Sequence, residues 1–463
     1  MTSPTKSDNY KWLLLGLVWV TYFLQQGTRQ MYGAMLPQIK KDFLADGVTD
    51  LQLGLVVSVF VLVYAFAVPF AGITADLFRR KWVLVSGTLM FSVGIFISGF
   101  ATTIGLLLIT YGILNAVGQS MIPSPSTSLI AQFHTDTRST ALSIYQMALY
   151  IGIVICSCVS GWVSGLSQGS WRWAFLIFGA FGILWFFVLL LFLRDTPSAG
   201  KHPDQKKIPE SEDAISTGGS SSTEPIAVKK ATFLQVIFAI LSKPSFLFMT
   251  LAFGMCLYGA NGYKTWMTKY MADSFTSLTP TTAAFHAVFW FFAGALFGIA
   301  IASRISDRVA KNRPGFRMEM NFIGLTLAAP FVFLVVYVDG LTACCAALFF
   351  YGMAQGVYDS NFFAAIYDVI EPRFHAAATG IFCCGAFIIG SSAPPVLGWI
   401  ANQKAVVWER IATNIAPSLL DWMANQPNLS MKVGFASLAI FYLIGAGFIA
   451  IARVFFLKKD FVK

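Results

Sequence analysis

Charged residues are scarce in this chain. Asp, Glu, Lys and Arg make up 12% of its 463 residues, about half of the share that is usual in soluble globular proteins. Hydrophobic residues make up 56%, and the mean hydropathy is +0.68. So little charge on so apolar a chain excludes a soluble enzyme and a disordered scaffold, and it predicts an integral membrane protein.

The chain also lacks the motifs of enzymes and of ATP-driven pumps. It has no nucleophile–base arrangement, no GxxxxGK[ST] phosphate-binding loop and no His/Cys cluster at metal-ligand spacing. Its seven cysteines all lie inside apolar runs, where small core residues are expected rather than redox pairs. The sequence therefore predicts no enzymatic activity, no cofactor and no metal site.

Long apolar segments alternate with short polar loops, and a polar stretch over 194–236 divides them into two sets of six. This stretch is rich in Pro, Gly, Ser and charge, as flexible linkers are. We therefore predict an all-α membrane protein with twelve transmembrane helices, six in an N-terminal bundle over 1–193 and six in a C-terminal bundle over 237–463. The predicted spans are 12–38, 52–74, 82–101, 104–131, 139–165, 173–193, 244–271, 281–303, 319–338, 341–366, 376–400 and 431–457.

The Lys and Arg residues behind the net charge of +10 sit in short loops between the apolar runs. This placement is typical of membrane topology and argues against nucleic-acid binding. Most of the basic loops fall on one side of the predicted membrane, and the positive-inside rule makes that side cytoplasmic. We therefore expect a multi-pass protein of a bacterial inner (plasma) membrane, with both termini in the cytoplasm.

A similar pattern of charge follows the second and the eighth predicted spans. It reads GITADLFRRK from Gly72 to Lys81 and SRISDRVAKNR from Ser303 to Arg313. In each copy an acid closes a span and a basic cluster follows, so the acid can pair with Arg and with a neighbouring helix N-terminus. We expect a clasp that opens and closes on the cytoplasmic side; the alternative is that the basic residues only anchor loops at lipid headgroups. The clasp residues are Asp76, Arg79, Arg80, Asp307, Arg308 and Arg313.

The first copy resembles the G-x-L-A-D-R-x-G-R-R signature of the major facilitator superfamily, with Leu77 in place of the first basic residue and Arg79 in place of the second glycine. The six-plus-six arrangement of spans extends the resemblance over essentially the whole chain. It implies the major facilitator fold, in which two pseudo-symmetric bundles rock about a substrate site at the membrane midplane. One chain would contain a full transport pathway, so we expect a functional monomer.

Two shorter stretches resemble two branches of that superfamily, the organic anion–cation symporters and the organophosphate–phosphate antiporters: TRQMYGAMLP from Thr28 to Pro37, and YKTWMTKYM from Tyr263 to Met271, with Thr268 in place of a proline. A third stretch, RDTP from Arg194 to Pro197, is similar to one seen in the organophosphate branch. The symporters carry an Arg and a Glu in their fourth span, whereas the matching stretch from Tyr111 to Pro123 has no charge. The resemblance implies an organic anion as substrate, and it leaves coupling to a proton, to sodium or to a counter-anion open.

Arg29 is the most conspicuous charged residue inside a predicted span. It lies eleven residues before Lys40, about 16 Å from the outer edge at about 1.5 Å per helical residue. A charge at this depth costs about 2.5–3.5 kcal/mol. Arg29 should therefore face a cavity, where its guanidinium can bind a carboxylate or a phosphate through two hydrogen bonds. The alternative is a structural ion pair with a buried acid such as Asp359.

Lys264 occupies the corresponding place in the seventh predicted span, nine residues before Asp273. Spans one and seven are equivalent in the two halves, so Arg29 and Lys264 could bind one anion from opposite sides. The alternative is that the long Lys264 side chain reaches the membrane surface. Polar and aromatic residues complete a site suited to a sugar-like anion: Tyr32, Tyr111, Gln119, Tyr145, Gln146, Asn261, Tyr263 and Asn361.

Asp359 is the clearest acid inside a predicted span. It could carry a proton, close a gate with a cationic residue or accept a hydrogen bond from a substrate hydroxyl; a purely structural role is the alternative. His286 in the eighth span could titrate near neutral pH, although a lone histidine in a membrane helix is more often a hydrogen-bonded core residue.

These residues together predict a secondary active transporter that moves a small organic anion, of the sugar acid or sugar phosphate type, across the membrane by alternating access. Arg29 and Lys264 would neutralise the anion while the clasps open and close. The partners would be the anion, the lipid bilayer and a coupling proton, sodium ion or counter-anion. Two alternatives stay open: a neutral sugar or drug exporter of the same superfamily, and a membrane sensor that binds without transporting.

Overall fold

The structure is a computed structural model of the chain, and it describes residues 6–43, 47–134, 138–194, 238, 240–310, 313, 315–371, 375–403, 407–408, 410 and 428–461. The predicted linker from 195 to 236 lies outside the described residues, as do the side chains of Asp76 and Asp307. Within the described ranges, every element of secondary structure is a helix.

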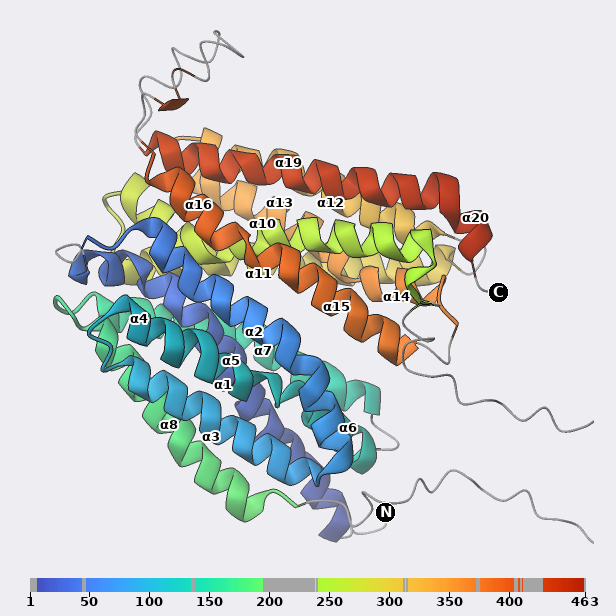
Figure 1. The fold of residues 1–463 in the computed structure, drawn as a ribbon, viewed down its shortest axis with the longest axis horizontal. Coiled ribbons are helices and arrows are strands. Elements are labelled where there is room, and N and C mark those ends of the chain that lie inside the picture. The colour runs from blue at the N-terminus through green and yellow to red at the C-terminus, as the bar shows by residue number, and fades with distance from the viewer. Residues whose placement is uncertain are drawn as a thin grey trace, which may run out of the picture.

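The helices form two bundles that lie side by side (Figure 1). The first bundle contains α1 (Lys6–Asp42), α2 (Asp50–Leu77), α3 (Arg80–Ser98), α7 (Arg138–Ser164), α8 (Trp171–Phe192) and a span made of α4 (Ile104–Leu107), the π-helical turn η1 (Leu108–Leu114), α5 (Asn115–Ser120) and α6 (Pro123–Phe133). The second contains α10 (Pro244–Ser274), α11 (Pro280–Val309), α12 (Phe316–Tyr337), α13 (Leu341–Asp359) with α14 (Phe362–Tyr367), α15 (His375–Ser391) with α16 (Ala393–Ala401), and α19 (Leu429–Ile451) with η4 (Ala452–Phe456) and α20 (Leu457–Asp460).

Eleven helical segments among the described residues are long and apolar enough to cross a membrane. Each of them overlaps one of the predicted spans from the second to the twelfth. The first predicted span corresponds to α1, which is the longest described helix at 37 residues but is more polar than the other membrane-spanning helices. Several of its polar side chains are buried among the other helices: Thr21, Gln25 and Thr28 are buried, and the Gln25 amide donates to the carbonyl oxygen of Gln119.

Among the described residues, the closest backbone contacts between the two bundles lie toward one end. At the end where α1 finishes and α2 begins, a Cβ at Gly54 would overlap the carbonyl oxygen of Pro394, and a Cβ at Gly398 would overlap that of Asp50. Five helical turns further along α2, on the same face, Gly72 has no atom within 4 Å of an added Cβ. Figure 1 shows the bundles diverging toward the end that carries both chain termini. We call these the closed end and the open end.

Glycine is what allows α2 and α16 to approach so closely, because helices with larger side chains at the contact pack about 8–10 Å apart. We therefore predict that Gly54→Leu forces the closed end apart, while Gly72→Leu, on the same face of α2, does not. Spin labels at Gln52 and Gln403 would report the separation by double electron–electron resonance. A folded Gly54→Leu protein with the wild-type distance would contradict this account of the closed end.

Candidate functional site

A cavity of about 330 Å³ lies between the two bundles, near the middle of α1 and α10. Its walls come from both halves of the chain, so any ligand in it touches two bodies that must move relative to each other in alternating access. The lining residues are Gln26, Arg29, Gln30, Tyr32, Gly33, Val57, Phe60, Val61, Tyr64, Tyr111, Leu149, Ile153, Leu257, Asn261, Lys264, Thr265, Phe292 and Phe387.

Arg29 enters this cavity from α1 and is held by aromatic rings rather than by an acid. The central carbon of its guanidinium lies 4.8 Å from the ring centroid of Tyr64 and 5.1 Å from that of Phe60. Among the described residues, no carboxylate lies within 4 Å of its nitrogens. Rings attract the cation through their faces and leave the guanidinium N–H groups available to a bound anion.

Lys264 lines the cavity from α10, on the opposite side. Its amino nitrogen lies 5.8 Å from the ring centroid of Phe292. It too has no carboxylate within 4 Å in the described part of the chain. Lys264 is within electrostatic range of both Arg29 and Asp359. The structure thus places two cations on one cavity, without the ion pairs that usually accompany buried charge.

The backbone at Lys264 also joins the two bundles. The Gln30 amide donates a hydrogen bond of 2.8 Å to the Lys264 carbonyl oxygen, and a Cβ at Gly33 would lie 2.7 Å from the same oxygen. This contact closes the cavity on the side of the closed end. The Lys264 side chain therefore faces the cavity while its carbonyl takes part in the seal.

Five of the predicted substrate-binding residues line this cavity: Arg29, Lys264, Tyr32, Tyr111 and Asn261. The two tyrosine hydroxyls are already used, since Tyr32 donates to the Leu53 carbonyl and Tyr111 to the Arg29 carbonyl. Their contribution to the cavity is ring surface. The Asn261 amide nitrogen donates to the Gly390 carbonyl at 3.1 Å, so its carbonyl oxygen is the atom that can accept a hydrogen bond from a ligand hydroxyl.

The other five predicted residues do not line the cavity. Gln119 is buried behind α1, where its amide donates to Thr28 and Asn115. Tyr263 is buried and donates to the Ala287 carbonyl. The remaining three are Tyr145, which stacks on Tyr22 with 4.2 Å between ring centroids, Gln146, which is exposed, and Asn361, whose amide donates to Val357 and Ser360.

Several lining residues do not stand out in the sequence. Phe60 and Tyr64 are four residues apart on α2 and hold the Arg29 guanidinium, but they lie within an apolar run that looks like ordinary core. The aromatic pair at i and i+4 marks one face of a helix. Only the packing of α2 against α1 shows that this face meets Arg29.

Asp359 ends α13 near the open end and is exposed, although it does not line the cavity. Its carboxylate accepts a hydrogen bond of 2.9 Å from the Gln355 amide. Gln355 in turn accepts from the Tyr442 hydroxyl at 3.1 Å, and the hydroxyls of Tyr442 and Tyr351 are 2.7 Å apart. This chain of bonds fixes the position of Asp359. Arg29 and Asp359 do not form the ion pair that was the alternative explanation of Arg29.

His286 lies away from the cavity, in an apolar groove of about 490 Å³ between α11 and α13. Its ring nitrogen Nδ1 accepts a hydrogen bond of 3.0 Å from the indole N–H of Trp290, one turn further along α11. This is the arrangement of a hydrogen-bonded structural histidine, the alternative that the sequence left open.

The clasp residues lie at the open end. Arg313 bonds Glu319 at 3.1 Å, and Arg453 bonds the same carboxylate at 2.8 Å, so this network stays within the second bundle. Arg79 precedes α3 and is exposed, Arg80 begins that helix, and Arg308 is exposed near the end of α11. Every ion pair found among the described residues joins two residues of the same bundle. A clasp between bundles remains a prediction for the state in which the open end is closed.

Two helix bundles with a central cavity and discontinuous fourth, tenth and eleventh spans define the architecture of a secondary membrane transporter. The chain belongs to the Major Facilitator Superfamily, whose family model matches residues 18–394. This confirms the predicted family and fold, and both are those of membrane transporters rather than of enzymes.

Its relatives are distant. The chain is 25% identical over 392 residues to protein spinster homolog 1 of Xenopus laevis, covering 80% of this chain and 69% of that protein. It is 24% identical over 398 residues to the probable sulfoacetate transporter SauU of Cupriavidus necator, covering 84% of this chain and 87% of that protein. It is also 24% identical over 305 residues to a probable hexose phosphate transport protein of Chlamydia trachomatis, covering 65% of each chain.

Solved structures share the fold. A bacterial homologue of the human lysosomal transporter spinster, in an inward-facing and unoccupied conformation, matches with a TM-score of 0.78 at 20% identity and covers 99% of this chain and 100% of its own. The nucleoside transporter NupG matches with a TM-score of 0.62 at 15% identity, covering 96% of this chain and 99% of its own.

The different positions of Gln119 and Gln146 allow a test of whether Gln119 stabilises the fold. Gln119→Leu removes a buried amide that bonds Thr28 and Asn115, and leaving such partners unsatisfied costs about 1–3 kcal/mol. We expect a lower thermal unfolding midpoint for Gln119→Leu and an unchanged one for Gln146→Leu, its exposed counterpart. Equal midpoints for the two variants, measured side by side in detergent, would show that Gln119 does not support α1.

Proposed function

We propose that this protein moves a small organic anion of the sugar acid or sugar phosphate type across its membrane by alternating access. The observation that carries the proposal is the pair of cations, Arg29 and Lys264, that line one cavity from the two bundles with no described acid within 4 Å of either. An uncompensated cation inside the membrane is costly. A bound anion would offset that cost at both residues together.

The size and lining of the cavity support the same class of ligand. A volume of about 330 Å³ is at the lower end of the range for small-molecule sites, about 300–1,000 Å³. Ring faces from Tyr32, Tyr64 and Tyr111 can lie against the carbons of a sugar-like body, and Asn261 can accept a hydrogen bond from a hydroxyl. A larger, wholly apolar drug fits this lining less well.

The names of two relatives also support an organic anion as the substrate: one is named for sulfoacetate and the other for hexose phosphate. Sulfonate, phosphate and carboxylate all present oxygens that a guanidinium can bind through two hydrogen bonds. The spinster relatives carry no substrate in their names. The neutral-substrate exporter and the membrane sensor therefore stay as the alternatives that the experiments below must exclude.

The geometry suggests how an anion would drive the cycle. An anion between Arg29 and Lys264 is attracted by both bundles, so it binds more strongly to states in which the two cations are close. Opening the closed end must break the hydrogen bond from Gln30 to the Lys264 carbonyl. The anion would thus act on the same residue whose backbone seals the cavity.

We place Asp359 in this proposal as the coupling group and the six clasp residues as the gate at the open end. Asp359 is exposed at the open end, within electrostatic range of Lys264 and held by Gln355. Protonation would weaken its attraction for Lys264 and free the cation for the anion. In this scheme the closed end faces outward, both termini are cytoplasmic, the membrane is a bacterial inner membrane, and a monomer is sufficient.

The first test is a binding measurement on the purified full chain. Sulfoacetate, glucose 6-phosphate and glucuronate are each compared with neutral glucose for their effect on the thermal unfolding midpoint. We expect at least one anion, and not glucose, to raise the wild-type midpoint. Arg29→Gln and Lys264→Gln should each weaken the response about 10–100-fold in ligand concentration, since hydrogen bonds to charged groups contribute about 1.5–3 kcal/mol.

Lys458→Gln is the matched control, because it removes one exposed positive charge from α20 at the open end. It should respond to anions like the wild type. Stabilisation by glucose, or by an anion to the same degree in all variants, would favour the neutral-substrate exporter. Anion binding without uptake into proteoliposomes would favour the sensor.

Coupling is tested separately in proteoliposomes. Asp359→Asn should retain exchange of anion for anion, because it leaves Arg29 and Lys264 in place, and lose accumulation driven by a pH gradient. Radiolabelled anion uptake with and without an imposed gradient distinguishes the two activities. Full gradient-driven accumulation by Asp359→Asn would remove Asp359 from the coupling role and favour sodium or a counter-anion.

A further inference from the structure

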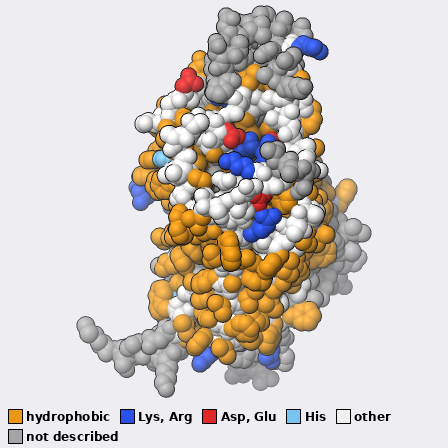
Figure 2. Space-filling model, turned by 90° about the vertical axis from the view of Figure 1, so that its left-hand side faces the viewer, with side chains coloured by type: hydrophobic (Ala, Val, Ile, Leu, Met, Phe, Trp, Pro, Cys, Tyr) orange, Lys and Arg blue, Asp and Glu red, His pale blue; other side chains and the backbone are white. Residues whose placement is uncertain are grey.

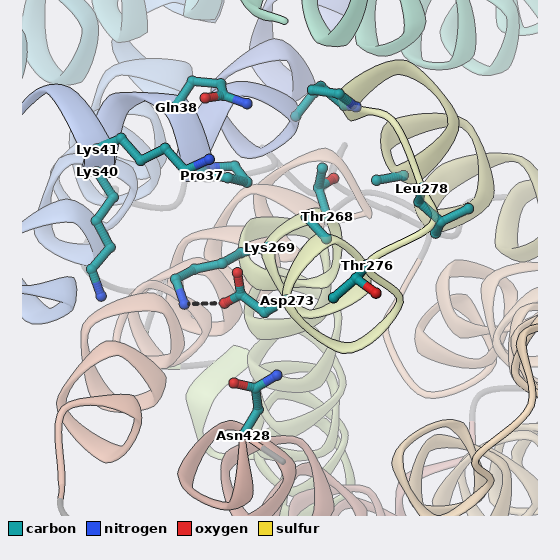
Figure 3. Close-up of a pocket in the computed structure, with 14 residues that line it drawn as sticks. Pro37, Gln38, Lys40, Lys41, Thr268, Lys269, Asp273, Thr276, Leu278 and Asn428 are labelled. Carbon is teal, nitrogen blue, oxygen red and sulfur yellow. Dashed lines mark hydrogen bonds and ion pairs between the residues drawn. The ribbon is translucent and has the colours of Figure 1, made fainter. Parts of the chain in front are cut away.

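A second cavity, of about 630 Å³, lies at the closed end, beyond the central cavity along the seam between α1 and α10. We call it the vestibule. Figure 3 shows residues of both bundles around it, with Lys40 and Lys41 extending from α1 and Lys269 from α10. The vestibule is lined by Ala34, Pro37, Gln38, Lys40, Lys41, Thr268, Lys269, Ala272, Asp273, Thr276, Leu278, Pro280, Ala283 and Asn428.

Only a short stretch of the seam separates the vestibule from the central cavity. On α1, Gly33 lines the central cavity and Ala34 lines the vestibule; on α10, the corresponding residues are Thr265 and Thr268. The barrier between them includes the contact of Gln30 and Gly33 with the Lys264 carbonyl. Joining the two cavities therefore requires α1 and α10 to separate at this contact.

The vestibule carries unbalanced positive charge. Lys40 pairs with Asp50 at 2.5 Å, and Lys269 pairs with Asp273 at 2.6 Å. Lys41 is exposed and has no acidic partner within 4 Å in the described part of the chain. Figure 2 looks onto the closed end and shows Lys and Arg side chains near the middle of that face, with Asp and Glu side chains beside them. Lys41 therefore gives the vestibule lining one positive charge that no described acid pairs with.

Lys41 and Arg29 lie on the same helix, α1. They are twelve residues apart on α1, which separates them by about 18 Å at about 1.5 Å per residue. Gln38 is three residues before Lys41, so the two side chains are neighbours on the helix surface. Lys41 and Gln38 both line the vestibule, so they can offer an ammonium and an amide to one ligand on its way to the two cations deeper in the protein.

We propose that the vestibule is a second, weaker recognition site for the transported anion, in which Lys41 binds the phosphate, sulfonate or carboxylate group before it passes to Arg29 and Lys264. This inference rests on the proposed function for the identity of the ligand. A basic recess concentrates anions and speeds their arrival, and salt screens the effect. Loss of Lys41 should therefore raise the KM for uptake from the closed end and leave the maximal rate nearly unchanged.

The charge of the vestibule can be measured without any transport. Ala272→Cys introduces a thiol into the lining, and the rates of its modification by an anionic and a cationic methanethiosulfonate are compared, with the wild type as background. We expect the anionic-to-cationic rate ratio to fall at least about threefold when Lys41→Gln is added at low salt. Lys458→Gln, the control at the other end of the molecule, should leave the ratio unchanged.

Binding is tested by protection of the same thiol with inorganic phosphate in lipid-free detergent. Phosphate should slow modification in the Arg29→Gln background, where the central site is disabled, and fail to do so with Lys41→Gln. An unchanged ratio and unchanged protection in Lys41→Gln would overturn the vestibule site, even if Arg29→Gln still abolishes substrate binding. Protection that requires added anionic lipid would also overturn it, in favour of a lipid headgroup.

Failure of the proposed function gives a different pattern. In that case no organic anion stabilises the wild type, yet the charge ratio and the phosphate protection at the vestibule still depend on Lys41. The vestibule would then stand as an anion site of the closed end, and the claim that its ligand is transported would fall.

Discussion

The structure depends on the positive charge of Arg29, which lies inside the membrane-spanning part of the protein and pairs with no acid among the described residues. Aromatic faces from Phe60 and Tyr64 hold the guanidinium in place, and the cavity in front of it gives its N–H groups room for a ligand. An acid in this position would satisfy the charge permanently. Because rings attract the cation without using its hydrogen-bond donors, the charge stays available for a molecule that comes and goes.

The polar groups that the second bundle contributes to the cavity come from one short segment of α10, from Asn261 to Thr265. Lys264 contributes its side chain to the cavity and its carbonyl to the seal with Gln30 and Gly33. Close approach of the two bundles at the closed end depends on glycines that bring backbone against backbone. Ligand binding and sealing therefore share the same few residues, so a small displacement of α10 against α1 affects both. The vestibule lies directly on the other side of this contact.

The sequence predicted the family, the fold and the two cations, because a charge inside an apolar run is rare and must face the protein interior. It was less informative for uncharged polar residues. Gln119 and Tyr263 are residue types expected in a sugar-binding site, yet the side chain of each donates a hydrogen bond to a neighbouring helix. A sequence does not say which helix lies opposite. For the same reason the sequence did not single out Phe60 and Tyr64, which matter because their rings contact the Arg29 guanidinium.

The polarity of α1 bears on how the chain enters the membrane. The Gln25 amide finds its partner at Gln119 of α5, and Thr21 accepts a hydrogen bond from Trp185 of α8. Both partners belong to helices that are synthesised well after α1. An amide in hydrocarbon without such a partner is unfavourable. Because these partners lie on helices that follow α1 in the chain, the stability of α1 in the bilayer depends on the packing of α5 and α8, and the N-terminal bundle assembles cooperatively rather than by insertion of independent spans.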